Sequence, residues 1–134
     1  MAFSNYLENL ILDFLLRDGE FTKPDTIAIG LVTTLADDAG NYTEVATSIG
    51  YERQTLSTAD DWAALSNGTT SNETKLTFGP ATDDWGNVKG FIITDSATHD
   101  AGNLLIHGAL NNNRDVFTDD TFEVNLNHLE IVLN

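Results

Sequence analysis

The stretch of sequence that decides the fold is ATDDWGNVKGFIITDSATHDAGNLLIHGAL, residues 81–110. Apolar side chains alternate with small or polar ones on both sides of a small, polar segment that ends near Gly102. Alternation of this kind is typical of strands with one buried face, and the polar segment is typical of a hairpin turn. The stretch therefore predicts two antiparallel strands with a short connection, whose side chains face water rather than a catalytic pocket.

Further segments with strand character lie on both sides of this hairpin: residues 26–33, 51–56, 75–78, 121–126 and 129–133. They bring the total to about seven strands and predict a mainly β fold, an antiparallel β-sandwich or flattened barrel. We expect a single domain over residues 1–134, with the β part at about 26–134. Phe122, Val124 and Leu126 are predicted to point inward.

The one convincing helical pattern covers about residues 4–18. Asn5 is the expected N-cap, with Glu8 in a capping-box-like position, and Gly19 is the expected stop. Apolar residues recur at helical spacing and form a stripe: Leu7, Leu10, Ile11, Phe14 and Leu15. Such a stripe needs cover. The favoured cover is the sheet of the same chain, where Ala28 and Gly30 leave room behind a strand, and the alternative is a neighbouring subunit.

Charge and composition exclude several classes of function. The chain carries 21 acidic and 6 basic residues, a net charge of −15, so we expect no nucleic-acid partner and no anionic membrane partner. No apolar run reaches membrane-spanning length, the first residues lack the basic start of a signal peptide, and cysteine is absent. The long polar connection 57–74, with Trp62 and Leu65 as expected anchors, has the length of a binding loop.

No motif for catalysis or cofactor binding is present, so the sequence predicts no enzyme, no cofactor and no metal centre. Ser96, His99 and Asp100 lie close together, but in the predicted turn, and are interpreted as turn residues rather than a triad. Arg53 is expected to pair with a carboxylate. His99, His107 and His128 lack metal-ligand spacing. Acidic pairs are interpreted as solvated turns, with calcium binding as the alternative: Asp37-Asp38, Asp60-Asp61, Asp83-Asp84 and Asp119-Asp120.

A series of short motifs, in order along the chain, resembles a family of small structural proteins of tailed-phage virions. The series begins with the helix Phe3–Asp13 of the form F-S-x-Y-L-E-N-x-L-L-D. It continues through the strand Ile27–Leu31, Gly50–Arg53 (G-Y-x-R), Trp85–Val88 (W-G-x-V), Gly102–Leu105 (G-N-L-L), Gly108–Leu110 (G-x-L), and a last part with Asp120, Thr121, Phe122, Leu129, Ile131 and Leu133. Asp119 stands where the family pattern has glycine.

This resemblance implies a virion structural protein. The compact size and acidic charge favour a capsid decoration or cement protein that stabilises the outer surface of the major capsid shell. The alternative is a tail-fibre or tail-tip module that binds the host surface, with a surface glycan as its partner. The expected partners are the major capsid protein and copies of the chain itself in a homo-oligomer such as a trimer. Phe3, Leu7 and Trp62 are the predicted contact residues.

Overall fold

The computed structural model describes residues 1–133, so Asn134, the last residue of the predicted domain, lies outside the described part. The described chain is mainly β, with one helix near its start. The elements are β1 (Ala2–Phe3), α1 (Asn5–Leu16), β2 (Ile27–Thr34), β3 (Thr43–Glu44), β4 (Gln54–Leu56), β5 (Thr69–Ser71), β6 (Leu76–Phe78), β7 (Gly86–Thr94), β8 (Leu104–Val116), β9 (Phe122–Val124) and β10 (Glu130–Val132).

The predicted hairpin is confirmed and forms the centre of the main sheet. β7 and β8 pair antiparallel from Thr94 opposite Leu104 to Gly86 opposite Val116. The strand order is β1-β8-β7-β2-β3, and β4 also pairs with β2. β8 continues beyond Leu110 through a polar run, since the first residues of β7 supply backbone partners there.

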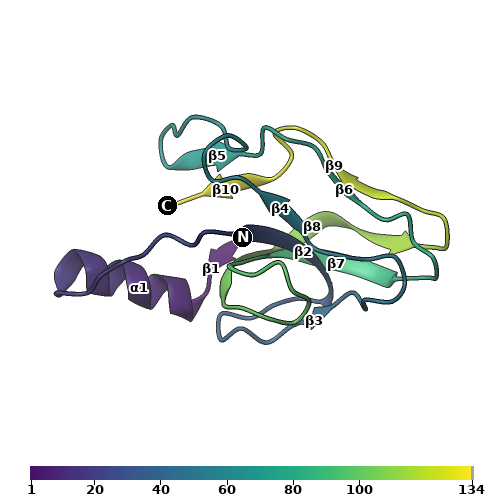
Figure 1. Ribbon diagram of the computed structural model, residues 1–134, viewed down its shortest axis with the longest axis horizontal. Helices are drawn as coiled ribbons and strands as arrows, with labels where there is room; N and C mark the ends of the chain where they lie inside the picture. Colours follow the sequence, from purple (N-terminus) through teal and green to yellow (C-terminus); the bar gives the residue numbers. More distant parts are fainter. Residues whose placement is uncertain (134) are drawn as a thin grey trace.

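Two small antiparallel sheets, β5–β10 and β6–β9, form a second layer. Figure 1 shows this layer above β2, β7 and β8, with α1 extending from one end of the molecule. The arrangement is sandwich-like and is not a closed barrel. It confirms the antiparallel sandwich and excludes the flattened barrel among the described residues.

An aromatic cluster fills the space between the layers. The rings of Tyr51 and Phe78 stack with centroids 6.2 Å apart, and Trp85 meets Tyr51 edge-on at 5.6 Å. Phe122 packs edge-on against Phe78 at 6.1 Å. These side chains are buried, and burying large aromatic surfaces is the main source of stability in a domain of this size.

The polar connection 57–74 differs from its prediction because it contains a strand. β5 lies within it, and the short strands β1 and β3 were also missed, which is why the described part has ten strands rather than about seven. These elements are two or three residues long, too short to show a period of two in the sequence. Leu126 is 53% exposed rather than inward, since β9 already ends at Val124.

The helix is capped one residue earlier than predicted and also ends earlier. Ser4, not Asn5, is the N-cap, because the Ser4 hydroxyl accepts a hydrogen bond from the Leu7 N–H at 3.2 Å. Arg17 ends the helix in an extended conformation, before Gly19. Among residues 1–133 no helix has the length and apolar character required to cross a membrane.

The expectation that this helix packs behind Ala28 and Gly30 is wrong. A Cβ atom added to Gly30 would lie 2.9 Å from the Tyr51 hydroxyl and 3.0 Å from Glu44 Oε1. The small residue is thus required, but by the side chains of Tyr51, Glu44 and Ile92 rather than by the helix. The close approach was predicted correctly and its cause was not.

Candidate functional site

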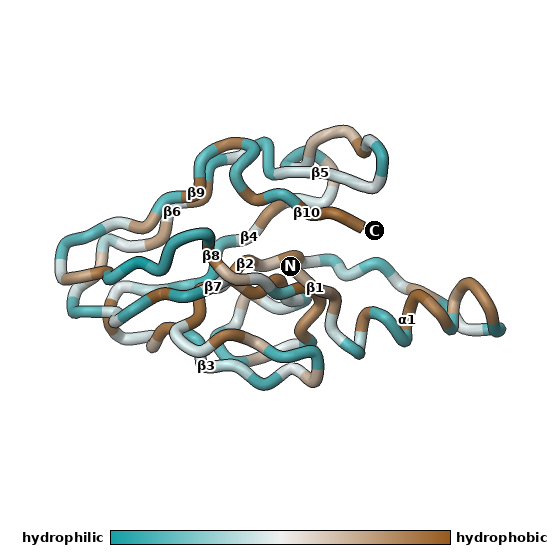
Figure 2. The backbone as a smooth tube through the Cα atoms, turned by 180° about the vertical axis from the view of Figure 1, so that it is seen from behind, coloured by the Kyte–Doolittle hydropathy of each residue, from teal (hydrophilic) through white to brown (hydrophobic). Residues whose placement is uncertain are grey.

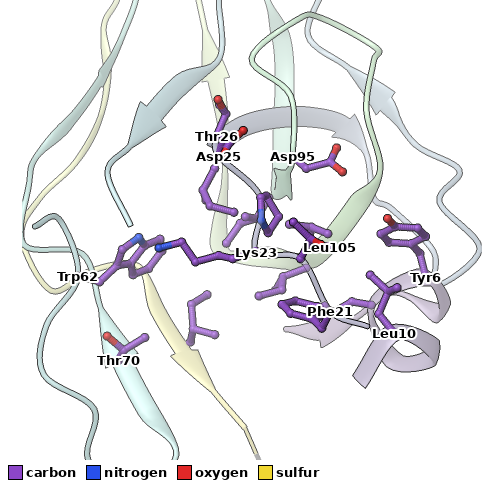
Figure 3. Close-up of a pocket in the computed structure, with 17 residues that line it drawn as sticks. Tyr6, Leu10, Phe21, Lys23, Asp25, Thr26, Trp62, Thr70, Asp95 and Leu105 are labelled. Atoms are coloured by element: carbon purple, nitrogen blue, oxygen red, sulfur yellow. The ribbon is translucent and has the colours of Figure 1, made fainter. Parts of the chain in front are cut away.

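An apolar groove of about 690 Å³ lies beside the sheet, bounded by α1, the connection 21–26 and the small sheet β5–β10. Its floor is apolar and comes from three strands of the main sheet and from β10: Ile27, Ile93, Leu105, Ile106 and Ile131. Figure 3 shows Trp62 and Thr70 on one wall, Tyr6, Leu10 and Phe21 on the other, and Lys23 extending between them. Asp25, Thr26 and Asp95 lie along one side.

Buried Asn72 holds the Trp62 wall in place. Its amide nitrogen donates to the carbonyl oxygens of Thr74 at 2.9 Å and Asn125 at 3.0 Å, and its side-chain oxygen accepts from the Leu129 N–H at 2.9 Å. Trp62 and Asn72 also form a β-bridge. Because a buried amide with satisfied hydrogen bonds is costly to displace, the connection 57–74 is ordered at this point. The polar residues on either side of Asn72 in the sequence do not indicate that Asn72 anchors this connection.

The structure brings two of the three predicted contact residues together. Leu7 and Trp62 both line the groove and are half-buried. Phe3 lies apart in β1, opposite Ile106 of β8, and packs against the core. Leu65, expected to anchor the same loop as Trp62, is 81% exposed and anchors nothing.

A second apolar surface lies on α1. Leu12 lies one turn before Leu15 and Leu16, and these residues are 54%, 66% and 78% exposed. We call these three residues the helix face. Only the first half of the predicted stripe, with Leu7, Leu10 and Ile11, is half-buried. Figure 2 shows the hydrophobic segments of α1 reaching its outer end. The favoured expectation of cover within the chain is therefore wrong for the outer half of the helix.

A buried ion pair supports the main sheet. Arg53 donates from Nε to Glu44 Oε1 at 2.8 Å and from Nη2 to Oε2 at 2.9 Å. The Tyr51 hydroxyl donates to Glu44 Oε1 at 2.6 Å and accepts from the Leu31 N–H at 2.9 Å, and the Asp100 N–H donates to Oε2. Burial would raise the pKa of the Glu44 carboxyl, but these hydrogen bonds outweigh it and hold that pKa below its ordinary value. The predicted pairing of Arg53 is confirmed.

The Arg53 guanidinium also ties this network to the β7–β8 connection. Its Nη1 donates to Thr94 Oγ1 and to the carbonyl oxygens of Ser96 and Ala101, all at 2.8–2.9 Å. Tyr51 and Arg53 belong to the quoted motif G-Y-x-R. Glu44 lies in a polar stretch of the sequence, which gives no sign that it is the carboxylate partner of Arg53. The charges of Glu44 and Arg53 are therefore paired with each other inside the fold.

The residues considered for a triad serve the same connection. His99 Nε2 lies 2.8 Å from the Val45 carbonyl oxygen, and the Ser96 hydroxyl accepts from the Thr98 N–H. Glu44, His99 and Asp100 present ligand-type atoms within 4.8 Å of one another. Glu44 already accepts four hydrogen bonds from protein groups, so a cation there would have to displace Arg53. We assign this cluster a structural role.

The acidic pairs lie at turns, where several carboxylates accept backbone hydrogen bonds. Asp37 accepts from the Asn41 N–H at 2.9 Å, Asp84 from the Thr118 N–H at 2.8 Å and Asp120 from the Phe117 N–H at 3.0 Å. All three side chains are exposed. This geometry agrees with the interpretation of the pairs as solvated turns.

Comparison with models of known protein families identifies a family for this chain. The model of the family described as Podophage GP4 fiber I protein gp80 matches residues 2–132. No curated protein matches the chain. The match spans nearly all of the sequence, including α1, the groove and both layers of the fold.

Proposed function

This chain belongs to the Podophage GP4 fiber I protein gp80 family and is a structural protein of the phage virion, and from this premise we propose that it is a component of the tail fibre. The family match over residues 2–132 is the observation that carries the proposal. It favours the tail over the capsid surface, and nothing in the fold favours the decoration function.

The helix face supports a role in assembly. A helix that is apolar on most of its surface is normally buried against a partner, and large exposed apolar patches mark interaction sites. We propose that the helix face packs against another copy of this chain, since homo-oligomers are the commonest assemblies and an apolar contact avoids like-charge repulsion. The major capsid protein is not needed as a partner.

The proposed role requires no reaction. The buried charged groups, Glu44 and Arg53, neutralise one another within the core. Phe3, Leu7 and Trp62 remain predicted contact residues; Leu7 and Trp62 line the groove, and Phe3 packs against the core.

Localisation in the particle tests the fibre proposal. Gold-labelled antibody against the purified chain should mark the tail, and gel densitometry should give a copy number of tail components, far below that of the major capsid protein. Label spread over the head, with copies approaching those of the capsid protein, would overturn the proposal in favour of the decoration function.

Charge placed on the helix face tests the assembly step. The double substitution Leu12→Glu and Leu16→Glu should shift the chain from an oligomer to a monomer, because burying two carboxylates without partners is unfavourable. Light scattering after size exclusion measures the mass. The unfolding free energy of the monomer should change by less than about 1 kcal/mol, since both side chains are exposed.

Leu65→Glu is the matched control, because Leu65 is as exposed as the helix face but lies outside it. This variant should keep the oligomer. An unchanged mass in the double variant would exclude the helix face as the contact.

A further inference from the structure

We propose that the groove beside α1 binds a neutral saccharide. The inference deepens the proposed function, because it gives a fibre component a ligand class on the host surface and rests on that function for its biological meaning. Its physical basis is separate: the groove combines an apolar floor, an aromatic wall and polar side chains along one side.

Trp62 provides the aromatic wall. The two tryptophans of the chain differ sharply in their surroundings. Trp85 is buried and its indole N–H donates to the Ile49 carbonyl oxygen at 2.8 Å. Trp62 is half-buried and lines the groove, and its indole N–H is open to solvent and makes no hydrogen bond within residues 1–133. A sugar ring has an apolar C–H face and a hydroxyl edge, which match an indole with a free N–H.

The polar side chains of the groove are placed to meet hydroxyl groups. Lys23 and Asp25 make no ion pair within 4.0 Å in the part of the chain that the structure describes. The Asp95 carboxylate accepts from Asn103, at 2.6 Å from its N–H and 2.9 Å from its side-chain amide, which fixes its position. Carboxylates accept from sugar hydroxyls, and a lysine donates to them.

These groups argue against a purely apolar occupant. A hydrophobic peptide laid in the groove would remove water from Lys23, Asp25 and the Trp62 N–H without replacing its hydrogen bonds, and such losses are costly. A ligand that has hydroxyls on its edge and C–H groups on its face satisfies both halves of the lining.

The charge of the site selects a neutral saccharide over an acidic one. Two carboxylates, Asp25 and Asp95, stand against the single cation of Lys23, in a chain of net charge −15. An anionic sugar such as a uronic acid would meet a repulsive field both near and far from the groove.

Titration of the full chain with oligosaccharides tests the proposal. The probes are maltotriose, cellotriose and chitotriose as neutral ligands and trigalacturonate as the acidic one. Binding is followed by tryptophan emission and by ligand-observed saturation-transfer NMR. At least one neutral probe should bind saturably and shift the emission. The dissociation constant of trigalacturonate should be at least about tenfold higher than that of this neutral probe.

Variants place the binding in the groove. Trp62→Ala should lower the affinity for the neutral probe by about tenfold or more, and Asp25→Asn should lower this affinity by a smaller factor. The matched controls are Leu65→Ala, on the same loop but outside the groove, and Asp83→Asn, an exposed aspartate elsewhere; both should bind as the unaltered chain does. Circular dichroism shows that each variant is folded.

Three results would overturn the inference: no binding of any neutral probe by the folded chain, tighter binding of trigalacturonate, or unchanged affinity in Trp62→Ala. None of these results concerns where the protein lies in the particle. If the groove binds no saccharide but antibody labels the tail, only the saccharide proposal is overturned. If the groove binds a saccharide but antibody labels the head, only the fibre proposal is overturned.

Discussion

At the scale of single residues, Glu44, Tyr51 and Arg53 link β3, β4 and the β7–β8 connection. The side chains of Glu44 and Arg53 are fully buried, and both oxygens of the Glu44 carboxylate accept hydrogen bonds. Such a pair holds a unique geometry when complete and becomes a liability when one partner is lost, because the other charge stays buried without compensation.

Removal of Arg53 should therefore destabilise the protein strongly. We expect Arg53→Met to lower the unfolding free energy by about 3–5 kcal/mol, measured by urea denaturation, since Glu44 would remain buried and unpaired. Lys75→Met is the matched control, because Lys75 pairs with Glu123 at 2.9 Å where both side chains are about half exposed. It should cost less than about 1 kcal/mol. Equal losses would show that the buried pair has no special role.

Tyr51 should make stability sensitive to alkaline pH. Burial, together with its hydrogen bond to Glu44, raises the pKa of the Tyr51 hydroxyl well above its ordinary value of 10.0. The folded state thus keeps the proton, while the unfolded chain releases it above pH 10. The stabilising contribution is full below that pH and falls as the pH rises beyond it.

Comparison of Tyr51→Phe with the unaltered chain measures this effect. The variant should be less stable at neutral pH by about 1–3 kcal/mol, because the Leu31 N–H and Glu44 lose a partner. Its unfolding free energy should decline less steeply above pH 10 than that of the unaltered chain. Tyr6→Phe is the control, since Tyr6 is 42% exposed. Parallel pH profiles for Tyr51→Phe and the unaltered chain would contradict the assignment.

At the scale of elements, α1 is joined to the sheet at its first turn. The Ser4 hydroxyl donates to the Leu104 carbonyl oxygen at 2.5 Å and caps the helix, and the Ser4 N–H donates to the Leu105 carbonyl oxygen at 2.9 Å. Beyond that turn the helix extends away from the strands (Figure 1). One buried serine thus sets both the start and the direction of the element.

Ser4→Ala should loosen the helix while leaving the sheet intact. The lost cap costs about 0.5–2 kcal/mol, and the Leu104 carbonyl oxygen loses its donor. Hydrogen exchange should become faster for the amides of residues 5–16 and stay unchanged in β7. Ser48→Ala, at an exposed serine, should change neither. Equal acceleration in β7 would show that the helix and the sheet unfold together.

At the scale of the whole molecule, a net charge of −15 opposes every contact between copies. If the helix face provides the contact, salt should strengthen the oligomer, because the screening length falls from about 10 Å at 0.1 M salt to about 3 Å at 1 M. Analytical ultracentrifugation over this range should show a falling dissociation constant. The double variant Leu12→Glu and Leu16→Glu should remain monomeric throughout.

Weaker association at higher salt would contradict this expectation. It would indicate that copies meet through ion pairs, with Lys23, Lys89 or Arg114 facing carboxylates of the neighbour. The helix face would then be free for another virion protein.

The sequence by itself determined the features that depend on neighbouring residues. Alternation around Gly102 gave the central hairpin, helical spacing from Leu7 to Leu15 gave α1, and the excess of carboxylates gave the charge. Each of these is a local or additive property, so periodicity and composition contain it. The order of short motifs likewise led to the virion family.

Only the tertiary structure decided which distant groups meet. Glu44 reaches Arg53 behind Gly30, Asn72 anchors the Trp62 loop from within a polar stretch, and the groove joins Trp62 to residues around Lys23. The tertiary structure also leaves the outer half of α1 exposed. The physical reason is that burial and pairing depend on contacts between segments far apart along the chain, and local patterns of side chains contain no record of such contacts.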